Sequence, residues 1–288
     1  MRDTCERPAG MILDLRGHSY HCECHGDPGG EAVLFLHGFS QSSRTWHPVL
    51  EELLGLPGGA GFRLVLFDLI GHGASDRPSD ARPYALEHMV EVLEALRLHL
   101  GLQRMHLVGY SMGGRIGLSY AARHPGSLLS LVLESASFGP RTLAEREAML
   151  ERDHALADRL RRSTPEQFAE WWAETSALES QRDLPVELRE AEAAMRRAND
   201  TRALALVTLG AGQGAMESLR NAAARLPVPL TYLVGGRDER YSALASEAHA
   251  EWGLDVRRFS TGHNVHLEER EEYARVLLGL LAKGRERR

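Results

Sequence analysis

One pentapeptide constrains this chain more than any other feature. Residues 109–113 read Gly-Tyr-Ser-Met-Gly, between an apolar run at 105–108 and a helix-like stretch that begins near Gly114. Glycines on both sides of Ser111 allow a sharp, strained strand-to-helix turn that exposes the hydroxyl, and a helix N-terminus favours negative charge beside it. The pentapeptide alone is a weak signal, but its position between a strand and a helix predicts a serine nucleophile.

A serine on such a turn requires an acid and then a histidine further along the chain. Asp238 follows the apolar run 230–234, and His263 follows a short strand-like run at 256–259. The carboxyl ends of parallel strands meet at one edge of an open sheet, where ligands bind. We therefore expect Ser111, Asp238 and His263 to lie together as a catalytic triad.

Two residues of the predicted triad have alternative candidates in the sequence. Glu134 also ends a strand-like run and competes with Asp238 for the role of the acid. His249 and His266 compete with His263 for the role of the base. The loop position favours Asp238, and the preceding glycine and strand favour His263.

Loops earlier in the sequence could supply backbone amides that stabilise the negative charge formed in the reaction. An apolar run at 32–36 leads into His-Gly-Phe-Ser at 37–40, and a second glycine-rich turn at 68–75 also follows a strand-like run. The backbone amides of Phe39 and Met112 could together form an oxyanion hole.

Together these motifs resemble the α/β-hydrolase superfamily, which implies an α/β fold with a mostly parallel central sheet flanked by helices. From about 141 to 220 the chain is helical in character and has no strand-like run. We expect this segment to be a helical lid inserted after the sixth strand, covering the serine and selecting the substrate. The predicted division is a first core part at 1–137, a lid at 138–217 and a second core part at 218–288.

The lid sequence narrows the resemblance. Phe-Ala-Glu-Trp-Trp at 168–172, Arg-Arg-Ala-Asn at 196–199 and Leu-Gly-Ala-Gly-Gln-Gly at 209–214 are similar to the 2-succinyl-6-hydroxy-2,4-cyclohexadiene-1-carboxylate synthases of menaquinone biosynthesis. Two residues depart from the pattern of that family: Ile70 stands where proline is usual, and Thr261 stands where alanine is frequent. The resemblance implies a carbon–oxygen lyase that eliminates pyruvate from 2-succinyl-5-enolpyruvyl-6-hydroxy-3-cyclohexene-1-carboxylate. It implies no metal and no organic cofactor.

Such an enzyme binds a polycarboxylate substrate and uses its serine as a base. Arg115 lies four residues beyond the serine on one helix face, where it could hold a carboxylate as a bidentate fork or merely cap a loop. The resemblance points to Arg146 and Arg197 as further substrate-binding residues, with Arg141 and Arg152 as alternatives to Arg146. The other candidate substrate-binding residues are Ser40, Tyr110, Trp171 and Trp172. The three aromatic side chains could equally serve packing.

Composition and charge give no indication of a nucleic-acid-binding or membrane protein. The net charge of −6 over 288 residues, with 43% hydrophobic residues, gives no indication of a nucleic-acid partner. No stretch approaches the roughly 20 apolar residues that cross a membrane, and residues 1–8 contain no apolar signal core. We expect a cytoplasmic protein with no membrane insertion, and the sequence leaves its oligomeric state open.

The chain contains three cysteines, Cys5, Cys22 and Cys24. An odd number without a framework spacing indicates reduced thiols. The later pair alternates with His21 and His25 and could be interpreted as a metal cluster. The alternation is more simply an early strand, paired in a hairpin with residues 11–15.

Two rival functions remain open at this stage. A carboxylesterase or carbon–carbon bond hydrolase would use the same triad, but an esterase for neutral esters has no need of an arginine-lined pocket. A non-catalytic ligand receptor on the same fold could also keep the triad. A haloalkane dehalogenase or epoxide hydrolase would require aspartate in place of Ser111.

Overall fold

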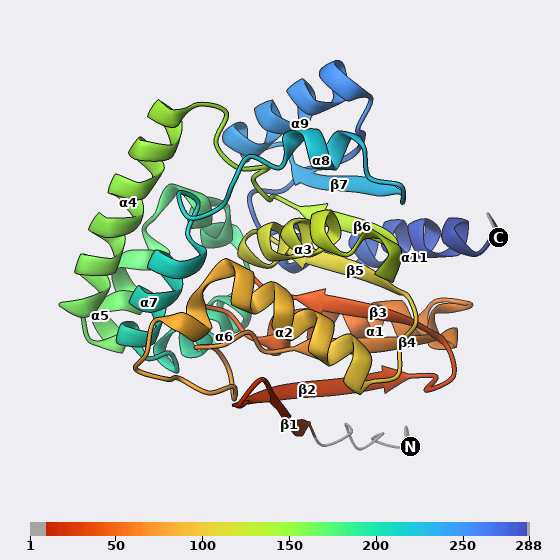
Figure 1. The fold of residues 1–288 in the computed structure, drawn as a ribbon, viewed down its shortest axis with the longest axis horizontal. Coiled ribbons are helices and arrows are strands. Elements are labelled where there is room, and N and C mark those ends of the chain that lie inside the picture. Colours follow the sequence, from red (N-terminus) through yellow and green to blue (C-terminus); the bar gives the residue numbers. More distant parts are fainter. Residues whose placement is uncertain (1–9, 287–288) are drawn as a thin grey trace.

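The computed structural model describes residues 10–286, so Cys5 and the segment 1–8 lie outside the described residues. Eight strands form one sheet in the order β1-β2-β4-β3-β5-β6-β7-β8 (Figure 1). β1 and β2 run antiparallel to their neighbours, and the strands from β4 to β8 pair in parallel. The strands are β1 (Met11–Leu15), β2 (His18–Gly26), β3 (Glu31–Leu36), β4 (Phe62–Phe67), β5 (Met105–Tyr110), β6 (Leu128–Glu134), β7 (Leu230–Gly235) and β8 (Asp255–Phe259). This is the expected α/β-hydrolase sheet.

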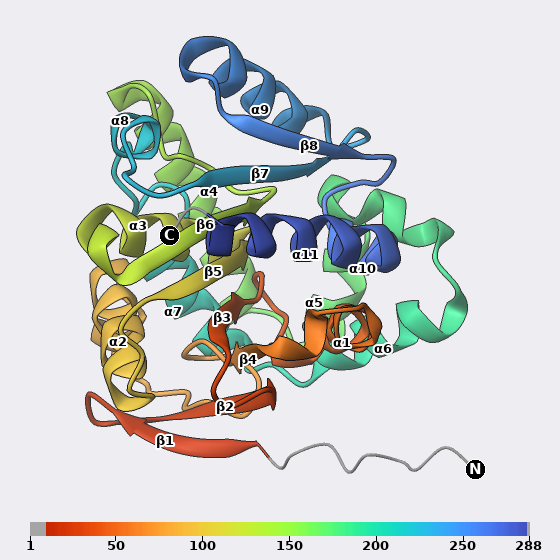
Figure 2. The same ribbon diagram turned by 90° about the vertical axis from the view of Figure 1, so that its right-hand side faces the viewer.

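Helices cover both faces of the sheet, as Figures 1 and 2 show. One hydrophobic core joins the sheet to α2, α3 and α9, and the other joins it to α1 and α11. The helices of the two layers are α1 (His47–Gly55), α2 (Leu86–His99), α3 (Met112–Arg123), α8 (Arg220–Ala224), α9 (Glu239–Trp252), α10 (Val265–Glu268) and α11 (Arg270–Glu286). Short 3₁₀ turns lie at η1 (Ser43–Trp46), η2 (Gly59–Gly61), η3 (Arg82–Tyr84) and η4 (Pro125–Ser127).

The first hairpin has the predicted pairing. Met11 lies opposite Cys22 and Leu15 lies opposite His18, so the strand interpretation of this segment is confirmed. Because successive side chains alternate between the faces of a strand, Cys22 packs in the core with α2 and α3, whereas His21 lies on the opposite face. Cys22 and Cys24 are both free thiols.

A helical segment stands between β6 and β7. It contains α4 (Leu143–Arg161), α5 (Pro165–Ala173), the 3₁₀ turn η5 (Ser176–Asp183), α6 (Val186–Arg197) and α7 (Thr201–Ala211). The predicted start of α5 is confirmed, since Thr164 and Gln167 form a reciprocal capping box. Figure 1 shows these helices grouped beyond the ends of β3, β5 and β6.

The segment has a small core of its own. Buried side chains of α4, α5 and α7 pack together, and Phe39 and Trp172 pack against them. Within residues 10–286, no helix is long and apolar enough to span a membrane.

Candidate active site

The turn after β5 holds Ser111 in a strained conformation. Its backbone has φ 48° and ψ −104°, in the region that L residues avoid, immediately before α3 begins at Met112. A Cβ at Gly109 would lie 2.6 Å from the carbonyl oxygen of Gly113, and one at Gly113 would lie 2.4 Å from that of Leu36. Glycine is therefore required on both sides of the serine, as the sequence pattern predicted.

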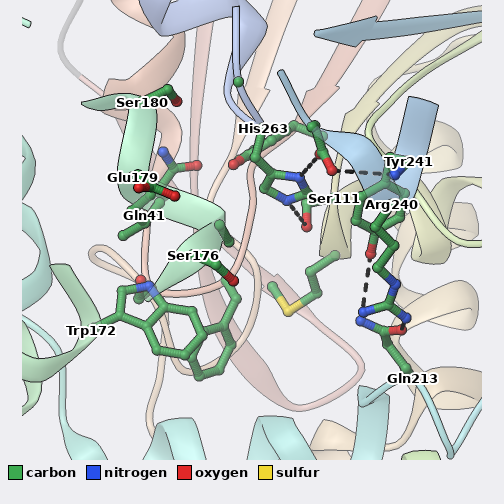
Figure 3. Close-up of a pocket in the computed structure, with 18 of the residues that line it drawn as sticks. Gln41, Ser111, Trp172, Ser176, Glu179, Ser180, Gln213, Arg240, Tyr241 and His263 are labelled. Carbon is green, nitrogen blue, oxygen red and sulfur yellow. Dashed lines mark hydrogen bonds and ion pairs between the residues drawn. The ribbon is translucent and has the colours of Figure 1, made fainter. Parts of the chain in front are cut away.

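Three side chains from separate loops converge at this turn (Figure 3). The Nε2 atom of His263 lies 3.1 Å from the hydroxyl oxygen of Ser111, and its Nδ1 atom lies 2.6 Å from a carboxylate oxygen of Asp238. The second carboxylate oxygen of Asp238 accepts the backbone N–H of Tyr241 at 3.2 Å and caps α9. The acid is thus fixed by the helix that it begins, and it can orient the imidazole toward the serine.

The competing acid and base pair with each other. Glu134 accepts a hydrogen bond at 2.8 Å from Nδ1 of His266, and both side chains are fully buried. The other ring nitrogen of His266 meets the hydroxyl of Thr45 at 2.9 Å. His249 lies on α9, where its Nδ1 donates to the carbonyl of Leu254. In this arrangement neither rival histidine contacts the serine.

The loop after β3 is held by neutral histidines and by the helical segment. Nε2 of His37 accepts the backbone N–H of Leu69 at 3.0 Å, and Nε2 of His72 accepts that of Ser40 at 3.2 Å. Asn199, beyond α6, donates to the carbonyl of Ser40 at 2.9 Å. Burial lowers the pKa of both histidines, that of His72 to about 3, which keeps these acceptors unprotonated. The loop that carries the amide of Phe39 is therefore rigidly placed.

A cavity of about 910 Å³ opens above the serine. Phe39 and Met112 line it together with Ser111, so the two candidate oxyanion amides border the same space. The N–H of Met112 belongs to the first turn of α3, where helical geometry provides no intrahelical acceptor. Ser40 and Tyr110 also line the cavity.

Arg115 projects into the cavity, where the charge of Asp153, another lining residue, acts on it without forming an ion pair. The residue is only 8% exposed, and its guanidinium donates one hydrogen bond, to the carbonyl of Ala211 at 2.8 Å. Its Nε has no hydrogen-bond partner among residues 10–286, and no described carboxylate forms an ion pair with it. Burial lowers the pKa of this guanidinium. A buried cation left this way is suited to an anionic ligand.

A second buried arginine, Arg196, also lines the cavity. It donates to the side-chain oxygen of Gln181 at 2.8 Å, and its guanidinium lies 3.6 Å from the carboxylate of Glu192. Glu192 in turn accepts a hydrogen bond from Gln41, which belongs to the loop after β3. This network ties α6 to the loop after β3 and leaves the charge of Arg196 partly compensated.

Three of the expected substrate-binding residues lie outside the cavity. Arg197 is exposed and lines a separate surface hollow with Trp171, whose indole donates to Ser163 and lies under the guanidinium of Arg159. Arg146 donates to the carbonyl of Gly214 and does not line the cavity. Adjacent residues of a helix point about 100° apart. The rotation of each helix about its axis directs these three side chains away from the cavity.

Trp172 does line the cavity (Figure 3). Its ring lies 5.2 Å from that of Phe39. Arg196, Glu192 and Gln181 were not among the candidates predicted from the sequence. The i, i+4 spacing of Glu192 and Arg196 on α6 is a signal that could have found these two residues, since such positions share one face of a helix.

Comparison with known proteins supports a specific relationship. Residues 31–270 match the family model of the alpha/beta hydrolase fold. The 2-succinyl-6-hydroxy-2,4-cyclohexadiene-1-carboxylate synthase of Salmonella paratyphi C is 33% identical over 255 residues, which cover 87% of this chain and 93% of the relative. A Bacillus subtilis relative, which carries the same synthase name provisionally, is 32% identical over 265 residues, covering 91% of this chain and 94% of the relative.

Solved structures agree with this relationship. MenH from S. aureus superposes with a TM-score of 0.83 at 27% identity and covers 92% of this chain and 98% of its own. A thermophilic esterase from Thermogutta terrifontis superposes with a TM-score of 0.79 at 24% identity, over 96% of this chain and 99% of the esterase, and so shares the fold. The chain therefore belongs to the α/β-hydrolase fold family and, within it, to the 2-succinyl-6-hydroxy-2,4-cyclohexadiene-1-carboxylate synthases.

Proposed function

We propose that this protein eliminates pyruvate from 2-succinyl-5-enolpyruvyl-6-hydroxy-3-cyclohexene-1-carboxylate, giving 2-succinyl-6-hydroxy-2,4-cyclohexadiene-1-carboxylate in menaquinone biosynthesis. The substrate carries carboxylates on its ring, its succinyl arm and its enolpyruvyl ether. Membership of the synthase family supports the reaction. The observation that carries the proposal is the buried guanidinium of Arg115, which forms no ion pair with a described carboxylate and faces the same cavity as Ser111.

The lining of the cavity is mixed in charge, with five arginines and the five carboxylates of Asp153, Glu179, Asp183, Asp238 and Glu239. The support for a polycarboxylate ligand comes from those arginines that form no ion pair. Beside Arg115, the cavity is lined by Arg240, whose guanidinium donates to the side-chain oxygen of Gln213 and forms no ion pair with a described carboxylate (Figure 3). Arg196 adds a third cation from α6. Charge-assisted, bidentate contacts to carboxylates are the task for which guanidinium groups are best suited.

The triad supplies the base for the elimination. His263, oriented by Asp238, accepts the hydroxyl proton of Ser111, and the serine oxygen removes the proton adjacent to the succinyl ketone. The electron pair of that C–H bond forms an enolate, whose oxygen receives hydrogen bonds from the amides of Phe39 and Met112. An oxyanion-hole donor of this kind contributes roughly 3 to 4 kcal/mol to the stability of a transition state.

The elimination then proceeds without a covalent enzyme intermediate. The enolate electrons move through the ring and break the bond to the ether oxygen, and enolpyruvate leaves and takes up a proton to become pyruvate. The proton abstracted from carbon returns to solvent or product through Ser111 and His263, which restores the starting state. The same serine would attack the carbonyl of an ester, so hydrolysis is the activity that must be distinguished.

Two variants separate these activities. Replacing Arg115 with methionine removes the charge and keeps much of the side-chain length, and Arg197→Met is the matched control because Arg197 lies outside the cavity. Pyruvate release and cleavage of p-nitrophenyl acetate are measured for both. We expect Arg115→Met to lower kcat/KM for the polycarboxylate by on the order of 100-fold or more, as the loss of a buried charge contact implies, with ester cleavage and the control unchanged. A loss in neither reaction, or an equal loss in both, would contradict the proposal.

A further inference from the structure

A second cluster of reactive side chains lies outside the active-site cavity. Glu23 and His25 occupy the same face of β2, and His47 begins α1. One carboxylate oxygen of Glu23 lies 3.0 Å from Nε2 of His25 and 2.9 Å from Nε2 of His47. The three donor atoms all lie within 4.8 Å of one another, and none of the three residues lines the cavity.

The two distances from Glu23 are close to those between ligand atoms of a tetrahedral metal site. Zinc binds imidazole nitrogen and carboxylate oxygen at about 2.0 to 2.2 Å, which places ligand atoms about 3.3 Å apart. The contacts from Glu23 to His25 and His47 need to open by only a few tenths of an ångström for an ion to replace the shared protons. Two imidazoles and one carboxylate leave a position for water, and the imidazole side chains are 11% and 17% exposed, so solvent reaches them.

The rest of the carboxylate is held by neighbouring groups. The hydroxyl of Ser43 donates to the other oxygen of Glu23 at 3.3 Å, and Nε2 of His21 lies 4.0 Å from it. His21 is itself fixed by Asp68, whose carboxylate lies 3.0 Å from its Nδ1 atom. Supporting contacts of this kind orient metal ligands and keep their geometry.

We propose that Glu23, His25 and His47 form a binding site for a divalent transition-metal ion, with zinc as the best fit to two imidazoles and a carboxylate. Cys24 is not a ligand in this site, because it packs against the core on the opposite face of β2. The ion would join β2 to the beginning of α1 and so strengthen the fold. The proposal does not depend on the reaction at Ser111.

The test uses the full chain, stripped of metal with a chelator and then dialysed against limiting zinc. Zinc content is measured by mass spectrometry, and thermal unfolding is followed with and without zinc. The ligand variants are His47→Gln and His25→Gln. The controls are His154→Gln, an exposed histidine on α4, and Cys24→Ser. Two ligand variants are used because a folding defect in His47→Gln would also abolish zinc binding. His25 lies near the end of its strand, so His25→Gln should disturb the fold less.

We expect one zinc ion per chain in the wild type and both controls, with a raised midpoint of unfolding, and neither effect in the ligand variants. The cobalt derivative should show visible d–d bands without a thiolate charge-transfer band. The inference is overturned if the wild type retains no zinc, if both ligand variants retain it, or if Cys24→Ser loses it.

Discussion

The neutral histidine behind the oxyanion loop makes stability depend on pH. His72 is fully buried, donates from Nδ1 to the carbonyl of Ile70 at 3.1 Å and accepts the N–H of Ser40 at Nε2. Burial, followed by the nearby His37, lowers its pKa from 6.5 to about 3. A second proton would occupy the nitrogen that accepts from Ser40. The folded protein therefore resists protonation that the unfolded chain accepts freely.

The sign and size follow from proton linkage. Between pH 6.5 and 3 the unfolded chain binds a proton at His72 that the folded chain does not, so stability falls as the pH falls. With these two pKa values, the contribution of His72 to the free energy of unfolding drops by about 2 kcal/mol from pH 7 to pH 5. The loss continues until the pH reaches the folded pKa. Buried His37, whose pKa is lowered for the same reason, acts in the same direction.

Urea denaturation at pH 7 and pH 5, followed by tryptophan fluorescence, measures this contribution. The variant His72→Gln removes the titrating group, and exposed His154→Gln serves as the control. We expect the variant to lose about 2 kcal/mol less than the wild type between the two pH values, and the control to follow the wild type. Equal losses in the wild type and His72→Gln would refute the reasoning.

Two further predictions concern the triad and its turn. Asp238→Asn should lower kcat for pyruvate release by on the order of 10³ to 10⁴, because it removes the charge that supports the imidazole. Glu134→Gln should leave kcat near the wild-type value, since Glu134 pairs with His266. Steady-state assays compare kcat for Asp238→Asn and Glu134→Gln. A larger loss in Glu134→Gln would show that Glu134 is the acid of the triad. Gly113→Ala should destabilise the fold by about 1 to 3 kcal/mol, because its Cβ would lie 2.4 Å from the carbonyl oxygen of Leu36. Unchanged urea stability would show that the turn relaxes freely.

The sheet was predictable because its signals are local. Apolar runs that end in polar or glycine-rich loops indicate strands that end at the same edge of the sheet. The turn at Ser111 requires a strand before it and a helix after it. The serine, the acid and the histidine were selected by their order and by the strands before them. Glu134 could not be excluded as the acid of the triad by these signals, because β6 and β7 are neighbours and both end at the same edge of the sheet.

The helical segment was less predictable because side-chain direction depends on helix phase. Trp171 and Trp172 are adjacent, yet only Trp172 lines the cavity. Arg196 and Arg197 divide in the same way, with Arg196 buried and Arg197 exposed. Charged, alanine-rich helices carry a weak apolar stripe, so tertiary packing determines which face turns inward. Arg146, on α4, likewise lies outside the cavity.

The most direct test is the rate of pyruvate release from freshly prepared 2-succinyl-5-enolpyruvyl-6-hydroxy-3-cyclohexene-1-carboxylate, measured for the wild type, Ser111→Ala and the exposed control Ser246→Ala. The account predicts release far above the spontaneous rate for the wild type and the control, and a loss of on the order of 10³-fold or more in Ser111→Ala. Release by the wild type at only the spontaneous rate, or full activity without the serine hydroxyl, would contradict it.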